Sequence, residues 1–130
     1  MNLAQIILSV LLAFLGVLWV RRALLRRSIR HYRPSEVAGR VTPPRECVLL
    51  DVRTDAEFRD QHIKGALHIP VQTLAQRIDE LARYRDREII CYCRTGNRSM
   101  AAAAQLKKAG FTVANMKGGI LEWDFSQHRQ

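Results

Sequence analysis

The chain has 130 residues and a formal net charge of +9, so its length allows about one globular domain. The charge is uneven: six arginines stand between positions 21 and 33 without any acidic residue, and the rest of the chain holds 15 basic and 12 acidic residues. The arginines directly follow an apolar run and few aromatic residues lie among them, so we expect no nucleic-acid binding.

The first part of the chain is predicted to be a membrane anchor. Leu3–Val20 carries no charge, and at about 1.5 Å per residue a helix of this length reaches about 27 Å, most of a bilayer core. A cleaved signal peptide is the alternative, but it normally has basic residues before its apolar run rather than after it. We predict a transmembrane helix with its basic flank over residues 1–27 and a linker over residues 28–33. By the positive-inside rule, the rest of the chain lies on the cytoplasmic side of an inner (cytoplasmic) membrane.

From position 34 onward, short apolar runs alternate with helical patterns. Strands are predicted at Cys47–Val52, just before Pro70, at Glu88–Tyr92 and at Phe111–Met116, and helices at Asp55–Asp60, Gln72–Tyr84, Asn97–Ala109 and after Gly119. Thr54 and Glu57 match a capping box for the helix that follows Thr54. Ser35 is predicted to cap a brief helical turn, and Pro43 and Pro44 exclude regular structure at their positions.

This alternation predicts one α/β domain over residues 34–130, with a parallel or mostly parallel sheet and helices on both faces. Ligands bind at the carboxyl ends of the strands in such folds. Cys93 directly follows a predicted strand and therefore lies at that edge. Asp51 and Arg53 end a strand too, and we interpret them as holding the strand-end loops. The other polar and aromatic residues interpreted as structural are His62, His68 and Trp123.

Three cysteines make no disulfide framework. Cys91 and Cys93 are two residues apart, so their Cα atoms on a strand lie about 6.6 Å apart, near the upper limit for a bridge. Two neighbouring thiols also fall short of a zinc site, which needs a second pair of Cys or His. We therefore expect reduced thiols in a cytoplasmic domain, no metal and no cofactor. Cys47 and Cys91 are interpreted as buried strand residues, with Cys91 a candidate second thiol.

The turn that begins at Cys93 has the residues that stabilise an anion. It stands at the N-terminus of a predicted helix, whose free N–H groups favour a thiolate or a bound anion. Arg94 and Arg98 add positive charge, and Gly96 lets successive N–H groups point inward as a nest. Further donors of the turn are Thr95, Asn97 and Ser99. The turn is therefore suited to a thiolate, a persulfide or an oxyanion.

Cysteine phosphatases and the related arsenate reductases are the main rival interpretation. Their loop places five residues between its cysteine and its arginine, which fits a tetrahedral phosphate. Counting in the same way from Cys93 reaches Ser99, whereas Arg98 gives a loop one residue shorter. The shorter loop favours a compact sulfur species over a phosphoryl group.

Several motifs in order resemble a single rhodanese domain from about Pro34 to Phe125. They are Leu50-Asp51-Val52-Arg53 with Glu57-Phe58, His62-Ile63-Lys64-Gly65-Ala66 with Ile69-Pro70, Tyr92-Cys93-Arg94-Thr95-Gly96-Asn97-Arg98-Ser99, and Lys117-Gly118-Gly119 with Trp123. The resemblance implies a five-stranded parallel α/β fold and sulfurtransferase activity. It also implies that Cys93 is the nucleophile that accepts a sulfane sulfur as a persulfide.

The predicted reaction is a double displacement that moves sulfur from thiosulfate or a persulfide donor to a thiol or cyanide acceptor. The predicted substrate-binding residues are Arg94, Thr95, Gly96, Asn97 and Arg98. The two arginines would attract a small anionic donor. A membrane-tethered docking module without catalysis is the alternative, ahead of the phosphatase. The short tether also predicts a membrane protein partner that delivers or receives sulfur.

Overall fold

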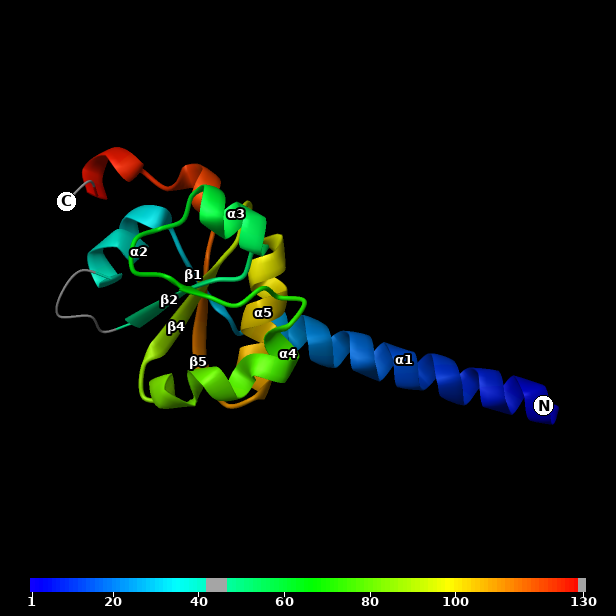
Figure 1. Cartoon of the computed structure of the whole chain (residues 1–130). Coiled ribbons are helices and arrows are strands. Elements are labelled where there is room, and N and C mark those ends of the chain that lie inside the picture. Colours follow the sequence, from blue (N-terminus) through cyan, green and yellow to red (C-terminus); the bar gives the residue numbers. More distant parts are fainter. Residues whose placement is uncertain (42–46, 129–130) are drawn as a thin grey trace.

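The computed structural model describes residues 1–41 and 47–128, and its centre is a five-stranded sheet (Figure 1). The strands are β1 Arg30–Tyr32, β2 Cys47–Asp51, β3 Leu67–His68, β4 Glu88–Tyr92 and β5 Thr112–Met116. The α-helices are α1 Leu3–Arg27, α2 Pro34–Val41, α3 Asp55–Asp60, α4 Leu74–Arg77 and α5 Asn97–Lys108. The 3₁₀ helices are η1 Ile78–Tyr84, η2 Ile120–Glu122 and η3 Phe125–His128.

The strand order is β1-β5-β4-β2-β3, and every neighbouring pair is parallel. The predicted five-stranded parallel sheet is therefore confirmed. β4 lies at its centre and is buried on both faces, as its continuous apolar sequence requires. Ile89 and Cys91 contribute to the apolar core on one face, and Ile90 and Tyr92 to the core on the other.

Helices cover both faces, also as predicted. On one face Ala102, Ala103 and Leu106 of α5 are buried in the core, and the small size of the two alanines lets this helix approach the sheet closely. On the other face Val37 of α2 and Trp123, which follows η2, pack on the sheet. The capping box predicted for α3 is present, with Thr54 as the N-cap.

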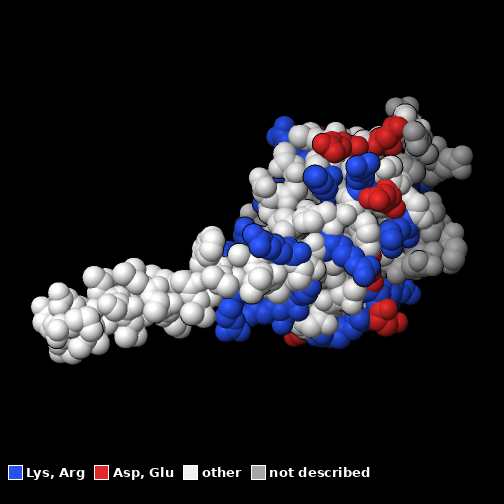
Figure 2. All heavy atoms as spheres, turned by 180° about the vertical axis from the view of Figure 1, so that it is seen from behind, with Lys and Arg blue, Asp and Glu red and all other residues white. Residues whose placement is uncertain are grey.

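α1 extends away from this domain, and none of its 25 residues is buried (Figure 1). It is long and apolar enough to cross a membrane, and a signal sequence near an N-terminus shares both properties. Lys and Arg side chains gather where the helix meets the domain (Figure 2). There the Nζ of Lys107 donates a hydrogen bond to the carbonyl oxygen of Ser28 at 3.0 Å, which ties the end of α5 to the end of α1.

The segment predicted as a linker contains a strand. Within residues 28–33, Arg30–Tyr32 forms β1 and pairs in parallel with β5. The N–H of Lys117 also donates to the carbonyl oxygen of Tyr32 at 2.8 Å. Only Tyr32 of the three strand residues is buried. A three-residue edge strand with one buried side chain has no recognisable alternation of apolar and polar residues in the sequence. Its pairing with β5 stabilises it, rather than the local preference of its residues.

The helix predicted over Gln72–Tyr84 is divided. Four residues form α4, and η1 continues the chain as a 3₁₀ helix. The guanidinium of Arg77 pairs with Glu80 at 2.7 Å, and residues three apart lie above one another in a 3₁₀ helix. The apolar spacing predicted a helical segment but carried no information on its pitch.

The first helix of the domain is longer than the predicted brief turn. α2 begins with Pro34, whose missing N–H costs nothing at a first helical position. The carboxylate of Glu36 accepts the N–H of Arg33 at 2.7 Å, so another free donor at this helix start is satisfied. The helix then continues through Gly39 to Val41. Pro43 and Pro44 lie outside the described residues.

Candidate active site

Cys93 lies directly after β4 and before α5, at the carboxyl edge of the sheet. Gly96 is the N-cap of α5 and has a φ of 114°, a left-handed conformation that favours glycine. This turn brings the chain back over the sulfur within a few residues. The sequence therefore placed Cys93 correctly at a strand end and a helix start.

The segment after β5 fastens the Cys93 loop from the side. The N–H of Ile120 donates to the carbonyl oxygen of Cys93 at 2.9 Å, and the N–H of Leu121 donates to that of Arg94 at 3.3 Å. Gly119 permits this approach, because a Cβ at this position would overlap both carbonyl groups. Two loops that are distant in sequence thus form one unit at the edge of the sheet.

The sulfur of Cys93 is surrounded by hydrogen-bond donors. Cys93 is only 1% exposed, the N–H of Gly96 donates to its Sγ at 3.1 Å, and the Oγ of Ser99 lies 3.4 Å from it. Burial acts to raise the pKa of the thiol, but hydrogen bonds from Ser99, Gly96 and Thr95 favour the thiolate. The net effect holds the pKa of Cys93 below its ordinary value, which is typical of a reactive cysteine.

Most of the other residues of the loop have exposed side chains. Arg94, Thr95 and Asn97 are exposed, whereas Gly96 is buried. An exposed guanidinium at Arg94 is free to meet an incoming anion. How these residues contact a substrate stays a prediction.

Arg98 is committed to an ion pair that the sequence did not reveal. Its Nη1 and Nη2 donate to the two carboxylate oxygens of Glu57 at 2.6 and 2.9 Å, so α5 is joined to α3. The Arg98 guanidinium is the largest cause that lowers the pKa of Glu57 to about 2. In the sequence Glu57 stands out as a capping residue and as part of the Glu57-Phe58 motif, but the separation of 41 positions along the chain hides its contact with Arg98. Arg98 therefore acts on the site with much of its charge already balanced.

The other two cysteines differ from Cys93 in environment. Cys91 is fully buried, and burial, followed by the nearby Cys93, raises the pKa of its thiol to about 12. Cys47 contributes to the core on the opposite face of the sheet, and its Sγ donates to the carbonyl oxygen of Arg40 at 3.2 Å. Both observations agree with the interpretation of these thiols as buried strand residues.

Asp51 and Arg53 form a buried ion pair beside the site. The Nη2 of Arg53 donates to Asp51 at 2.7 Å and to the carbonyl oxygen of Gln61 at 2.6 Å. Both residues are at most 5% exposed, and the pair holds the chain on either side of α3. Their predicted role in fixing the strand-end loops agrees with this geometry.

The two histidines near α3 also have structural surroundings. His62 and His68 stack on the ring of Phe58, with centroids 3.7 and 4.3 Å away. Across residues 1–41 and 47–128, no group of three or more His, Cys, Asp or Glu side chains is placed to hold a metal ion.

Two buried polar residues complete the surroundings of Cys93. The Oγ of Ser99 is 2.5 Å from the Oδ1 of Asn115, and both residues are at most 3% exposed. In the sequence Ser99 stands out as a further donor of the turn, and Asn115 as part of a predicted strand. The available signal was the position of Asn115: a carboxamide inside an apolar strand needs a buried partner.

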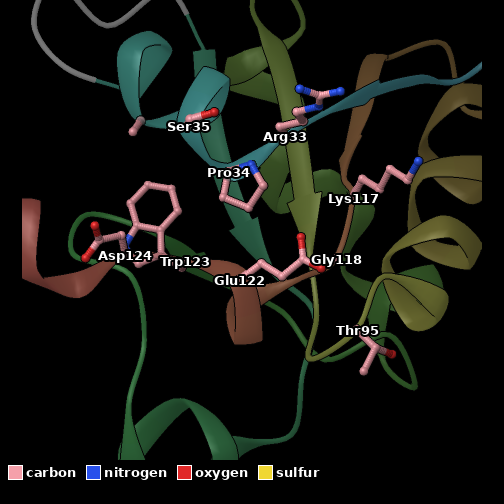
Figure 3. Close-up of a pocket in the computed structure, with 10 residues that line it drawn as sticks. Arg33, Pro34, Ser35, Thr95, Lys117, Gly118, Glu122, Trp123 and Asp124 are labelled. Atoms are coloured by element: carbon pink, nitrogen blue, oxygen red, sulfur yellow. The ribbon is translucent and has the colours of Figure 1, made fainter.

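A cavity of about 710 Å³ opens beside the Cys93 loop (Figure 3). Thr95 of that loop lines one part, and Pro34 and Trp123 line another. The Glu122 side chain extends toward Gly118, on the segment that fastens the loop. Trp123 is only 7% exposed, so most of its ring belongs to the core and one edge faces the cavity. The cavity offers room for a molecule larger than a simple anion next to the loop.

Known proteins resemble this chain in sequence and in fold. A sulfurtransferase of Allochromatium vinosum is 36% identical over 88 residues, which cover 67% of this chain and 80% of that protein. A tRNA uridine(34) hydroxylase of Buchnera aphidicola is 37% identical over 81 residues, but these cover only 26% of its length. The crystal structure of a rhodanese-related protein from Thermoplasma volcanium superposes with a TM-score of 0.66 at 28% identity and covers 72% of this chain and 89% of that chain.

The rhodanese-like domain family matches residues 34–125. This range contains the Cys93 loop, the Glu57–Arg98 pair and the segment that fastens the loop, while α1 and β1 lie outside it. The sulfurtransferase relative supports a rhodanese-type transferase in general. The chain belongs to the rhodanese-like domain family.

Proposed function

We propose that this protein transfers a sulfane sulfur from thiosulfate or a persulfide donor to a thiol or cyanide, with Cys93 as the carrier. The observation that carries the proposal is the surroundings of the Cys93 Sγ, where the N–H of Gly96 lies at 3.1 Å and the Ser99 hydroxyl at 3.4 Å. These donors favour a thiolate, which is the nucleophilic form of cysteine.

The first step is attack of the Cys93 thiolate on the outer sulfur of thiosulfate. A new S–S bond forms to Cys93, the S–S bond of the donor breaks, and sulfite leaves with the electron pair. The outer sulfur of the resulting persulfide carries the negative charge. In the second step cyanide or a thiolate attacks this outer sulfur, and the Cys93 thiolate leaves as it was at the start. A Cys93 that reacts as the thiolate needs no general base, and the hydrogen bonds that lower the pKa of its thiol favour that form.

The loop from Arg94 to Arg98 is proposed to bind the persulfide and guide the donor. Its inward backbone N–H groups supply hydrogen bonds for an anionic sulfur. The exposed Arg94 attracts the anionic donor, with Thr95 and Asn97 as further polar groups at the rim. Arg98 contributes less to this attraction than Arg94, because Glu57 balances its charge.

The direct test of the carrier role is the mass of the intact protein after incubation with thiosulfate. One added sulfur is expected on the parent protein, located at Cys93 by peptide mapping, and removed again by cyanide. Cys93→Ala should not take up sulfur, while Cys91→Ala should take it up as the parent does. An unmodified parent protein would favour the docking module, and turnover of an aryl phosphate that depends on Cys93 would favour the phosphatase.

We also propose that residues 1–27 anchor residues 34–130 to the cytoplasmic face of an inner membrane. Support comes from the exposed apolar surface of α1 and from the arginines at its end, which include Arg21, Arg22, Arg26 and Arg27. The domain would then stay within short reach of the membrane surface and of a membrane protein that supplies or accepts sulfur. Membrane fractions should retain the full chain after an alkaline wash, and intact mass should show residues 1–27 still attached. Recovery of a shortened chain in the soluble fraction would identify a cleaved signal instead.

A further inference from the structure

A line of polar contacts leads from Cys93 to the edge strand beside the anchor. The Sγ of Cys93 is 3.4 Å from the Oγ of Ser99, which is 2.5 Å from the Oδ1 of Asn115. The Nδ2 of Asn115 is in turn 3.3 Å from the Nδ1 of His31. These residues come from the end of β4, from α5, from β5 and from β1. Ser99 and Asn115 are buried, whereas His31 is exposed at the outer end of the line.

The Ser99 hydroxyl has one proton and several possible acceptors. Besides the Cys93 sulfur, the carbonyl oxygen of Gly96 lies 3.0 Å away and the carboxamide oxygen of Asn115 lies 2.5 Å away. With the carboxamide oxygen toward Ser99, the hydroxyl proton points away from Cys93. Cys93 can then form a hydrogen bond with Ser99 only as a thiol, which donates its own proton to the Ser99 oxygen. In this arrangement every donor in the line points outward, and His31 accepts at Nδ1.

The same positions also accommodate the reverse arrangement. If the Asn115 carboxamide turns by about 180°, its nitrogen donates to Ser99 and its oxygen accepts from His31. The Ser99 hydroxyl is then free to donate to Cys93. A thiolate accepts hydrogen bonds and donates none, so only this inward arrangement gives the ionised sulfur the Ser99 proton.

We propose that Asn115 and His31 are positioning residues for Cys93: the direction of the Asn115 carboxamide decides whether Ser99 donates to the thiolate, and His31 selects that direction. A proton on the Nδ1 of His31 requires the carboxamide oxygen to face it and so favours the thiolate. A lone pair on that nitrogen favours the outward arrangement and the thiol. The inference rests on the proposed role of Cys93, but thiol ionisation is measured without any sulfur donor.

Other charged groups surround the two ends of this line. Near His31 they are Arg30 and Arg33 on its own segment, Lys107 at the end of α5 and Lys117 after β5. Near Cys93 they are Arg98 with its partner Glu57, and Asp51, which acts on Arg98 together with Cys93. A test must therefore separate the hydrogen-bond line from a general effect of charge.

The test is the rate of Cys93 alkylation by iodoacetamide across a pH series, with the full chain in detergent micelles. His31→Lys supplies only donors and should lower the pH at which the rate is half-maximal, whereas His31→Glu supplies only acceptors and should raise it. We expect the two midpoints to differ by about one pH unit, the size of a hydrogen bond to a charged group. Arg30→Glu makes the same change of two charges on the opposite face of β1, and it should leave the midpoint nearly unchanged.

A double-mutant comparison tests whether the effect passes through the buried groups. In an Asn115→Leu background, or in Ser99→Ala if the leucine variant does not fold, the two His31 substitutions should give the same midpoint. The proposal is overturned if the two His31 variants keep different midpoints in these backgrounds. It is also overturned if Arg30→Glu shifts the midpoint equally, or if the two His31 variants have the same midpoint without a second substitution. Loss of sulfur uptake with the midpoint shifts intact would instead count against the transfer function and leave the positioning roles in place.

Discussion

The ends of β2 and β4 are neighbours at the carboxyl edge of the sheet, since Asp51 pairs with Tyr92, yet they use polar groups in opposite ways. After β2, the Nε and Nη2 of Arg53 donate to Asp51, and Nη2 also donates to a backbone carbonyl. After β4, backbone N–H groups and a hydroxyl converge on one sulfur. Satisfied polar groups hold a loop in place, whereas donors that converge on one sulfur stabilise a negative charge there. The first end is structural and the second is suited to chemistry.

The largest expected effect comes from removing the sulfur at the β4 end. Cys93→Ala should abolish sulfur transfer from thiosulfate to cyanide while changing the free energy of unfolding by only about 1 kcal/mol, because a small side chain is shortened. The matched variant Cys91→Ala should retain most of the transfer rate. Equal loss of rate in the two variants would contradict the assignment of Cys93.

At the β2 end the expected change is in stability. Arg53→Met should lower the free energy of unfolding by about 3–5 kcal/mol, because it leaves the fully buried carboxylate of Asp51 without a partner. Denaturant titration of the variant measures this loss. The double variant Asp51→Asn with Arg53→Met should recover part of it, and a double variant less stable than the single one would refute the explanation.

A smaller effect is expected from the hydroxyl that faces the sulfur. Ser99→Ala removes a donor that favours the thiolate, so the alkylation midpoint of Cys93 should rise by about one pH unit. Thr95→Ala is the matched control, because it removes a hydroxyl from an exposed side chain and keeps the backbone N–H. An unchanged midpoint in the Ser99 variant would show that the backbone donors alone lower the pKa.

The smallest effect is expected at the ion pair that bridges the two loops. The Arg98 guanidinium lowers the pKa of Glu57 to about 2, so the stability it confers is complete above the ordinary carboxyl value of 4.5 and is lost as the pH falls toward 2. Since both side chains are about one-third exposed, we expect about 1 kcal/mol. Glu57→Gln should remove this pH dependence from the free energy of unfolding. A parent protein whose stability does not change in this window would contradict the prediction.

The sequence predicted most of the fold because its central strands are continuous apolar runs. The predicted range Glu88–Tyr92 agrees with β4 at both ends, and α3 begins and ends as its capping pattern indicated. β1 escaped detection because an edge strand of three residues gains its stability from pairing with β5. The Glu57–Arg98 pair and the Ser99–Asn115 contact escaped for the same reason, since each joins residues from separate elements.

The sequence by itself determined that a cysteine follows a central strand and begins a helix, because apolar runs, a glycine and a helical pattern are local signals. It also determined that an apolar helix precedes the domain. Only the tertiary structure decided what the polar residues of the Cys93 turn pair with. Ser99 of α5 contacts Asn115 of β5, Arg98 pairs with Glu57 of α3, and the Cys93 loop is held by Ile120 after β5. The donors that lower the pKa of the Cys93 thiol belong to its own turn, but the partners of Ser99 and Arg98 come from elements that only the folded chain brings together.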